Sequence, residues 1–208
     1  DNMLSAIGAG AVTAGIVVAS LGTSGTLFTC SDSPLRDPTG MVADFCDATG
    51  RHLPLICVMN MTGVTEAVRS LADESHDELE RAAGQIPAGC DGLRLLPYLR
   101  GERVPDLPNA SGTLWGIRPG NLRPGHLYRL AMESTALSLA AGAELLSEAA
   151  GGFHELRVVG GGARSALWRQ ILASVFGVPV VALAEGETGA LWAALSAAWS
   201  IGSPRDDP

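Results

Sequence analysis

The sequence predicts an α/β protein with a mixed β-sheet and helices on both faces of that sheet. Its first third has the pattern of a three-stranded meander, near 16–21, 25–30 and 52–59. Its last third alternates strands with helices, from a strand at 156–159 to a closing helix at 186–201. Antiparallel pairing in the meander and parallel pairing across the later crossovers give one mixed sheet. The 208 residues, 47% of them hydrophobic, are enough to bury a core.

The first half of the chain opens with a helix of small residues, expected over 3–14. The next two strands form a hairpin, because Gly22-Thr23-Ser24-Gly25 between them has the composition of a tight turn. Proline has no N–H to donate, so we expect Pro54 to lie near the start of the third strand, or that strand to lie at the sheet edge. Helices are expected at 62–72 and 76–83, and the acidic residues at the start of the second are expected to form a solvated helix face.

The second half is more regular. A short strand at 93–96 leads into a loop whose length suggests a functional role. Pro124 begins a long helix with apolar residues at helical spacing, and Gly151 marks its end. After the next strand comes a triple-glycine turn and then a helix that Ser165 is expected to cap. A further strand and the closing helix complete the alternation.

Charge and cysteine content exclude several classes of protein. All 14 basic residues are arginine, so the chain has no lysine for a P-loop or for a protein-kinase strand. Its net charge is −8 with no basic stripe, which argues against a nucleic-acid partner. The cysteine spacing fits no zinc motif, so no metal site is expected, and the thiols suit a reducing cytoplasm. The cysteines are Cys30, Cys46, Cys57 and Cys90.

One segment is long enough to cross a membrane, because no charged residue occurs between Met3 and Cys30. It is rich in glycine and hydroxyl residues, and the turn at 22–25 divides it. No basic region precedes it, as a signal peptide would require. We therefore expect a helix and a hairpin here, and no membrane span.

Two glycine turns carry the strongest functional signal. Gly22-Thr23-Ser24 and Gly160-Gly161-Gly162 expose backbone amides without a Cβ in the way, which suits phosphate oxygens. The first turn alone also fits an ordinary hairpin, and the second an ordinary strand-to-helix connection. A dinucleotide fingerprint is a further alternative, but its third glycine is Ser165 here and the upstream hairpin is wrong for a βαβ unit.

Other polar residues have two readings each. Asp1 stands before the first helix, where aspartate is a common cap, and an ionised carboxylate there also suits a general base. Glu102 and Arg103 either stabilise the loop as a pair or contact a substrate or another domain. The four histidines are scattered without metal spacing and read as structural or surface residues.

Several motifs resemble those of the FGGY carbohydrate kinases. Gly112-x-Leu114-x-Gly116-Ile117, followed by 126–127 and 131–133, is similar to the second signature of that family. The segment 160–170 resembles its adenine-nucleotide turn. Pro97-Tyr98-Leu99-x-Gly101-Glu102-Arg103-x-Pro105 and Phe45-Cys46 look like the xylulokinase branch. Val104, Asp47 and Ser111 depart from that branch and leave the sugar open.

The resemblance implies an actin/hexokinase-like (ribonuclease H-like) ATPase fold. Residues 1–208 would be the C-terminal nucleotide-binding domain, without the N-terminal sugar-binding domain. The implied reaction is ATP-dependent phosphorylation of a sugar primary hydroxyl, D-xylulose to D-xylulose 5-phosphate, with Mg²⁺. The alternatives are another sugar or polyol, or a non-catalytic nucleotide-binding module of the same fold. A homodimer remains open.

The resemblance also implies roles for seven residues. Asp1 would be the catalytic base that accepts the proton of the sugar hydroxyl. The γ-phosphoryl group would lie by Gly22, Thr23 and Ser24, and the adenine-ribose side by Gly161, Gly162 and Arg164.

Overall fold

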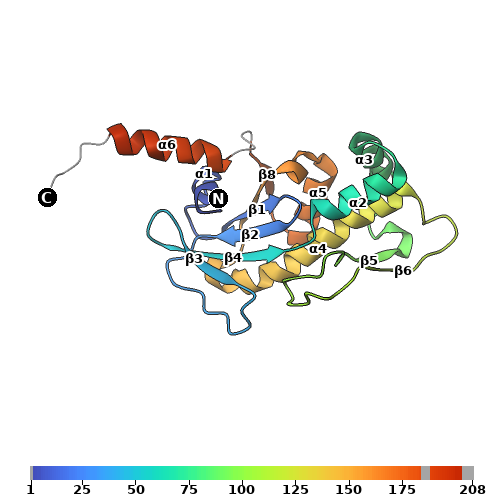
Figure 1. The fold of residues 1–208 in the computed structure, drawn as a ribbon, viewed down its shortest axis with the longest axis horizontal. Coiled ribbons are helices and arrows are strands. Elements are labelled where there is room, and N and C mark those ends of the chain that lie inside the picture. The colour runs from blue at the N-terminus through green and yellow to red at the C-terminus, as the bar shows by residue number, and fades with distance from the viewer. Residues whose placement is uncertain (1, 184–187, 203–208) are drawn as a thin grey trace.

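The computed structural model describes residues 2–183 and 188–202. Within them a six-stranded sheet has the order β3-β4-β2-β1-β7-β8 (Figure 1). β1, β2, β4 and β3 pair antiparallel, whereas β7 pairs parallel with β1 and with β8. The sheet strands are β1 (Ile16–Leu21), β2 (Gly25–Thr29), β3 (Ala43–Cys46), β4 (His52–Val58), β7 (Glu155–Val159) and β8 (Val180–Ala182). A separate two-stranded hairpin consists of β5 (Arg94–Leu96) and β6 (Thr113–Trp115).

Helices cover both faces of the sheet, as the sequence predicts. Val17, Ala19 and Leu21 of β1 point into the larger core, which α4 supplies with a row of buried residues. Val18, between them, points into a smaller core with residues of α1. α6 lies against α1 on that second face (Figure 1). The helices are α1 (Asn2–Gly8), α2 (Thr62–Ala72), α3 (His76–Gly84), α4 (Pro124–Ala150), α5 (Ala166–Phe176) and α6 (Thr188–Gly202), with short 3₁₀ turns η1 (Cys90–Gly92) and η2 (Gly161–Arg164).

Most predicted elements are confirmed close to their expected ends. The hairpin of β1 and β2 closes at the predicted turn, with Leu21 opposite Gly25. α4 starts at Pro124 and ends before Gly151, whose φ of +65° favours glycine. Ser165 caps α5, because its side chain accepts a hydrogen bond from the Trp168 amide at 3.0 Å. Each of these signals depends on residues close together in the chain, so a single sequence is enough to recognise it.

Two expectations about the first half are wrong. The first helix ends at Gly8 instead of reaching residue 14, because the chain turns through Gly10 at φ +67°. β3 was not expected, and it covers the outer side of β4. Pro54 lies near the start of its strand, which is one of its two expected places, although β4 is an internal strand and not an edge. The missing N–H of Pro54 is tolerated because the ladder with β2 begins only at Leu55.

The uncharged segment near the amino terminus is α1 followed by the hairpin. Among residues 2–183 and 188–202, no helix combines the length and the apolarity that crossing a bilayer requires.

The four thiols are free and differ in exposure, which gives a first testable prediction. Burial, and next the charge of Glu133, raises the pKa of Cys90 to about 12, and burial also raises the pKa of Cys30. A thiol reacts as its thiolate. We expect a disulfide reagent such as DTNB to modify the exposed Cys46 rapidly in the native protein and to leave Cys90 unmodified. Cys90 should stay unmodified when the labelling is repeated at a pH raised by about one unit. A rapid phase that survives Cys46→Ser would contradict this assignment.

Candidate functional site

The two glycine turns meet at one cavity of about 720 Å³. Thr23 comes from the β1–β2 turn, and Gly161 and Gly162 come from η2. The amino-terminal turns of α2 and α3 adjoin the glycine turns and form further walls, and Tyr128 of α4 and Arg100 of the loop after β5 complete the lining. Segments nearly 140 residues apart in the sequence are thus brought together by the parallel pairing of β1 with β7.

The β1–β2 turn is fixed to the start of α2 by backbone hydrogen bonds. The Thr62 amide donates to the Gly22 carbonyl at 2.9 Å, and the Gly63 amide donates to the Thr23 carbonyl at 3.3 Å. These bonds use the turn's carbonyls and leave its side chains free. Thr23 and Ser24 are both exposed, so the turn presents hydroxyl groups outward from a rigid backbone.

The three glycines of the second turn have different structural roles. Gly160 has φ +86°, and a Cβ there would lie 2.9 Å from the Leu21 carbonyl oxygen. A Cβ on Gly162 would lie 2.9 Å from the Leu21 Cβ and 3.1 Å from the Trp168 ring. A Cβ on Gly161 would meet no atom within 4 Å. The fold therefore needs glycine at 160 and 162, whereas Gly161 borders open space.

A carboxylate from α3 occupies the amino terminus of α5. Glu80 Oε1 accepts hydrogen bonds from the Ser165 hydroxyl at 2.8 Å and from the Leu167 amide at 3.1 Å. Helix amino termini favour negative charge, so the side chain of Glu80 takes the place that an anionic ligand would otherwise find there. This end of the cavity suits hydrogen-bond donors of a ligand better than its phosphates.

A hydrogen-bonded chain of side chains forms the α2–α3 wall. His76 Nδ1 lies 2.7 Å from the Tyr128 hydroxyl, and His76 Nε2 lies 3.2 Å from Glu66 Oε2. A carboxylate only accepts, so Nε2 carries the proton and Nδ1 of a neutral ring accepts from Tyr128. Burial raises the pKa of Tyr128 to about 12, which keeps that hydroxyl protonated as a donor. The hydrogen bond from Arg69 lowers the pKa of Glu66.

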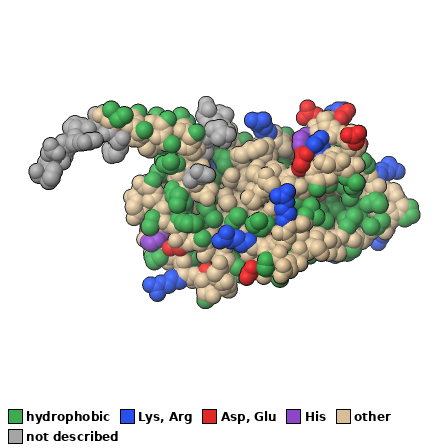
Figure 2. All heavy atoms as spheres, in the orientation of Figure 1, with side chains coloured by type: hydrophobic (Ala, Val, Ile, Leu, Met, Phe, Trp, Pro, Cys, Tyr) green, Lys and Arg blue, Asp and Glu red, His purple; other side chains and the backbone are tan. Residues whose placement is uncertain are grey.

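Charge is distributed unevenly around the cavity. Glu66, Asp77 and Glu80 line its α2–α3 side, and acidic side chains with a histidine among them gather over that end of the molecule (Figure 2). Arg100 and Arg164 also line it, and neither forms an ion pair with a described residue. Free guanidinium groups can each bind a phosphate in bidentate fashion, a role that lysine often fills elsewhere.

The structure places most of the predicted nucleotide residues together. Thr23, Gly161, Gly162 and Arg164 line the cavity. Gly22 and Ser24 flank Thr23 in its turn without lining the cavity. Asp1 lies outside the described residues, so its role stays a prediction.

Other contributors to the cavity were missed or misread in the sequence. His76 is exposed, which agrees with its reading as a structural or surface histidine, but it also lines the cavity; the acidic run supplies Glu80, which is not merely solvated. Arg100 belongs to the loop that was expected to be functional, although no motif in the sequence singles it out. No pattern in one sequence links His76 to Tyr128, 52 residues later.

Of the two readings of Glu102 and Arg103, loop stabilisation is confirmed for Glu102, but the bond between the two residues comes from the Arg103 amide and not from its guanidinium group. The buried Glu102 carboxylate accepts from the Met59 amide at 2.6 Å, from Asn60 Nδ2 at 3.0 Å and from the Arg103 amide at 2.8 Å. Asn60 also donates to the Gly101 carbonyl at 2.7 Å. These bonds attach the loop to the end of β4 and fix the backbone next to Arg100.

The geometry suits an elongated ligand with an anionic end and a hydrogen-bonding end. Hydroxyl groups and free guanidinium groups can bind phosphate, and carboxylates can accept from hydroxyl or amino groups. The open space beside Gly161 allows a ligand to approach the backbone closely.

Comparison with known proteins gives the family. The profile of the "FGGY family of carbohydrate kinases, C-terminal domain" matches residues 17–201. The xylulose kinase of Haemophilus influenzae is 41% identical over 97% of this chain and 41% of its own length. The crystal structure of xylulose kinase from Bifidobacterium adolescentis has a TM-score of 0.84 and 35% identity, over 97% of this chain and 40% of that one. That of gluconate kinase from Lactobacillus acidophilus has a TM-score of 0.87 and 29% identity, over 98% of this chain and 42% of that one.

The chain thus spans about two fifths of the length of these relatives. The structural neighbours are sugar kinases with the actin/hexokinase-like fold, and this chain shares that fold. The family profile covers nearly all of the six-stranded sheet and both glycine turns. The chain belongs to the FGGY family of carbohydrate kinases.

Proposed function

We propose that residues 1–208 are the C-terminal, nucleotide-binding domain of a longer ATP-dependent sugar kinase. The observation that carries this proposal is the cavity between the two glycine turns, with open space at Gly161 and the exposed hydroxyl of Thr23. The N-terminal sugar-binding domain would belong to the part of the protein outside this chain. Such an enzyme would act in the cytoplasm, where ATP is available.

ATP would lie along the cavity with its two ends in different surroundings. Its γ-phosphoryl group would lie at Gly22, Thr23 and Ser24, and its adenine-ribose side near Gly161, Gly162 and Arg164. The carboxylate of Glu80 supports this direction, because it lies beside η2 and would repel phosphates while accepting from ribose hydroxyls. Arg100 would supply a cationic group to the polyphosphate.

Asp1 would take the proton from the sugar hydroxyl as the oxygen attacks the γ-phosphorus. Little covalent chemistry is required of the protein in phosphoryl transfer, so positioning and charge stabilisation dominate the rate. The rigid backbone of the β1–β2 turn holds the Thr23 and Ser24 hydroxyls in place for that purpose. Bound Mg²⁺ would neutralise phosphate charge, and these hydroxyls are oxygen donors of the kind it accepts.

The proposed substrate is D-xylulose, which would become D-xylulose 5-phosphate. The support is the name of the Haemophilus influenzae relative at 41% identity, together with the motif at 97–105. The gluconate kinase neighbour makes another sugar or polyol the second candidate. A nucleotide-binding module without catalysis is a third.

A substrate panel on the full-length protein tests this proposal. ADP release would be followed with Mg-ATP and D-xylulose, D-gluconate or glycerol, each against a blank without sugar. We expect D-xylulose to give the highest kcat/KM. A clear preference for another compound would move the protein to a different substrate. No release with any of them, together with intact ADP binding, would identify a non-catalytic module.

Thr23→Ala is expected to lower phosphoryl transfer about 10- to 100-fold, with a smaller change in the KM for ATP. A hydroxyl beside the transferred group contributes most while charge is redistributed in the transition state. Steady-state kinetics of the full-length protein would separate kcat from KM, with Thr23→Ser as the control that keeps the hydroxyl. A change in KM alone would show that Thr23 binds the ground state and would displace the γ-phosphoryl position.

A further inference from the structure

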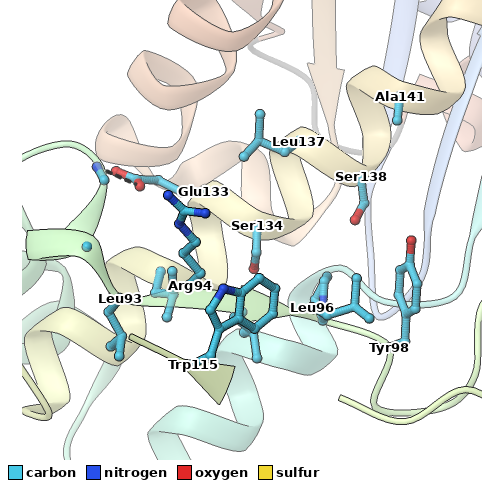
Figure 3. A pocket seen from close by; sticks show the side chains of 15 residues that line it. Leu93, Arg94, Leu96, Tyr98, Trp115, Glu133, Ser134, Leu137, Ser138 and Ala141 are labelled. Carbon is cyan, nitrogen blue, oxygen red and sulfur yellow. Dashed lines mark hydrogen bonds between the residues drawn. The ribbon is translucent and has the colours of Figure 1, made fainter. Parts of the chain in front are cut away.

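A second cavity, of about 550 Å³, lies between α4 and the β5–β6 hairpin. It shares no lining residue with the cavity between the glycine turns. Its walls are mostly apolar and include Leu96 and Trp115 from the hairpin and Leu137 from α4 (Figure 3). Trp115 is 45% exposed and Leu137 is 58% exposed, so the hollow leaves large apolar side chains in contact with solvent.

One cation without a partner faces this apolar cavity. Arg94 lies opposite Trp115 in the β5–β6 ladder, and its side chain extends past the indole toward Glu133 and Leu137 (Figure 3). It forms no ion pair with a described residue. An apolar hollow with a single unpaired guanidinium group has an excess positive charge that a ligand can neutralise.

The nearby acid does not serve as the partner of Arg94. Glu133 Oε1 accepts from Arg129 Nε at 2.7 Å, and Oε2 accepts from the Gly89 amide at 3.0 Å. Glu133 and Arg129 therefore neutralise each other within one hydrogen-bonded group. The positive charge of Arg94 is therefore not neutralised by Glu133.

Three hydroxyl groups complete the polar side chains of the cavity, and that of Ser134 already donates to the Ala131 carbonyl at 3.2 Å. Tyr98 and Ser138 stand at the other end from Arg94 (Figure 3), and the structure shows no hydrogen bond from either side chain to a described residue. A few separated polar groups around an otherwise apolar cavity of this size are typical of sites for small molecules. Together they fit a ligand with an anionic head, a flat or branched apolar body and a weakly polar tail.

We propose that this cavity is a binding site for a small amphipathic organic anion, with Arg94 holding its carboxylate, sulfonate or phosphate group. Trp115, Leu96 and Leu137 would cover the apolar body. Tyr98 is only two residues from Arg100 of the first cavity, so an occupant would contact the same loop. The proposal concerns binding alone and does not depend on the proposed kinase activity.

Fluorescence titration with a matched pair of probes tests it on the full protein. 8-Anilinonaphthalene-1-sulfonate combines an aromatic body with an anionic group, and N-phenyl-1-naphthylamine is its counterpart without the sulfonate. We expect saturable binding of the sulfonate and an affinity loss of about 10-fold or more in Arg94→Gln, because a charge-assisted hydrogen bond is removed. The neutral probe should bind Arg94→Gln as it binds the unchanged protein.

A second variant keeps the test decisive. Leu137→Glu places a negative charge at an exposed position, so folding should be retained while the sulfonate is repelled. Arg36→Gln and Leu71→Glu are the matched controls, since both residues are exposed and line neither cavity. Unchanged sulfonate affinity in Arg94→Gln and Leu137→Glu would overturn the proposal. Displacement of the probe by Mg-ADP, or binding that does not saturate, would overturn it equally.

Discussion

Asp1→Asn is expected to lower sugar phosphorylation by the full-length protein about 10²- to 10⁴-fold, which is the usual contribution of a general base. Asparagine caps a helix about as well as aspartate does, so the start of α1 should be retained. The substitution removes only the ability to accept the proton of the sugar hydroxyl. Nucleotide affinity and the unfolding temperature should therefore change little.

Three measurements on the same variant separate a base from a cap. Turnover with D-xylulose reports the chemical step, calorimetry with Mg-ADP reports the nucleotide cavity, and thermal unfolding reports the cap. Asp1→Ala serves as the control that loses both functions, and it should unfold at a lower temperature. Near-normal turnover of Asp1→Asn would show that Asp1 is a helix cap without a part in the reaction.

Gly161→Val is expected to weaken nucleotide binding about 10- to 100-fold, because the added side chain would project into the space where the ligand approaches the protein backbone. A Cβ at this position meets no protein atom within 4 Å, so the fold should tolerate it. Calorimetric titration of Mg-ADP into the full-length variant gives the affinity, and thermal unfolding gives the stability.

A neighbouring glycine and a distant one provide the comparison. Gly84→Val also adds a side chain where no atom lies within 4 Å, but away from the cavity, and should leave ADP affinity unchanged. Gly162→Val should instead destabilise the protein, since Leu21 and Trp168 leave no room for a Cβ. Unchanged ADP affinity in Gly161→Val would move the adenine-ribose site to another part of the protein.

Local signals account for what could be predicted from the sequence. The hairpin around Gly22–Gly25, the cap at Ser165 and the start of α4 at Pro124 each depend on residues within a few positions of one another. The glycine turns could be recognised as ligand-binding candidates for the same reason. The sequence alone could not show which of these glycines borders open space. Only the three-dimensional structure shows that Gly161 does so while Gly160 and Gly162 are packed.

Long-range contacts account for what could not be predicted. The hydrogen bonds from Ser165 and Leu167 to Glu80 join residues 85 and 87 positions apart. β3 is short and mostly exposed, so its sequence lacks the apolar alternation of a strand, and only pairing with β4 defines it. The acidic run shows the same effect, because composition marks it as solvated while the packing of α3 turns Glu80 toward η2.

Hydrogen–deuterium exchange of the full-length protein with and without Mg-ADP tests the central claim most directly, namely that the cavity between the glycine turns binds the nucleotide. We expect protection by Mg-ADP to concentrate in peptides covering 22–24, 61–66 and 160–165. Peptides covering β5 and β6 should exchange at the same rate in both states. Protection elsewhere, with unchanged exchange in both glycine turns, would contradict this account of the site.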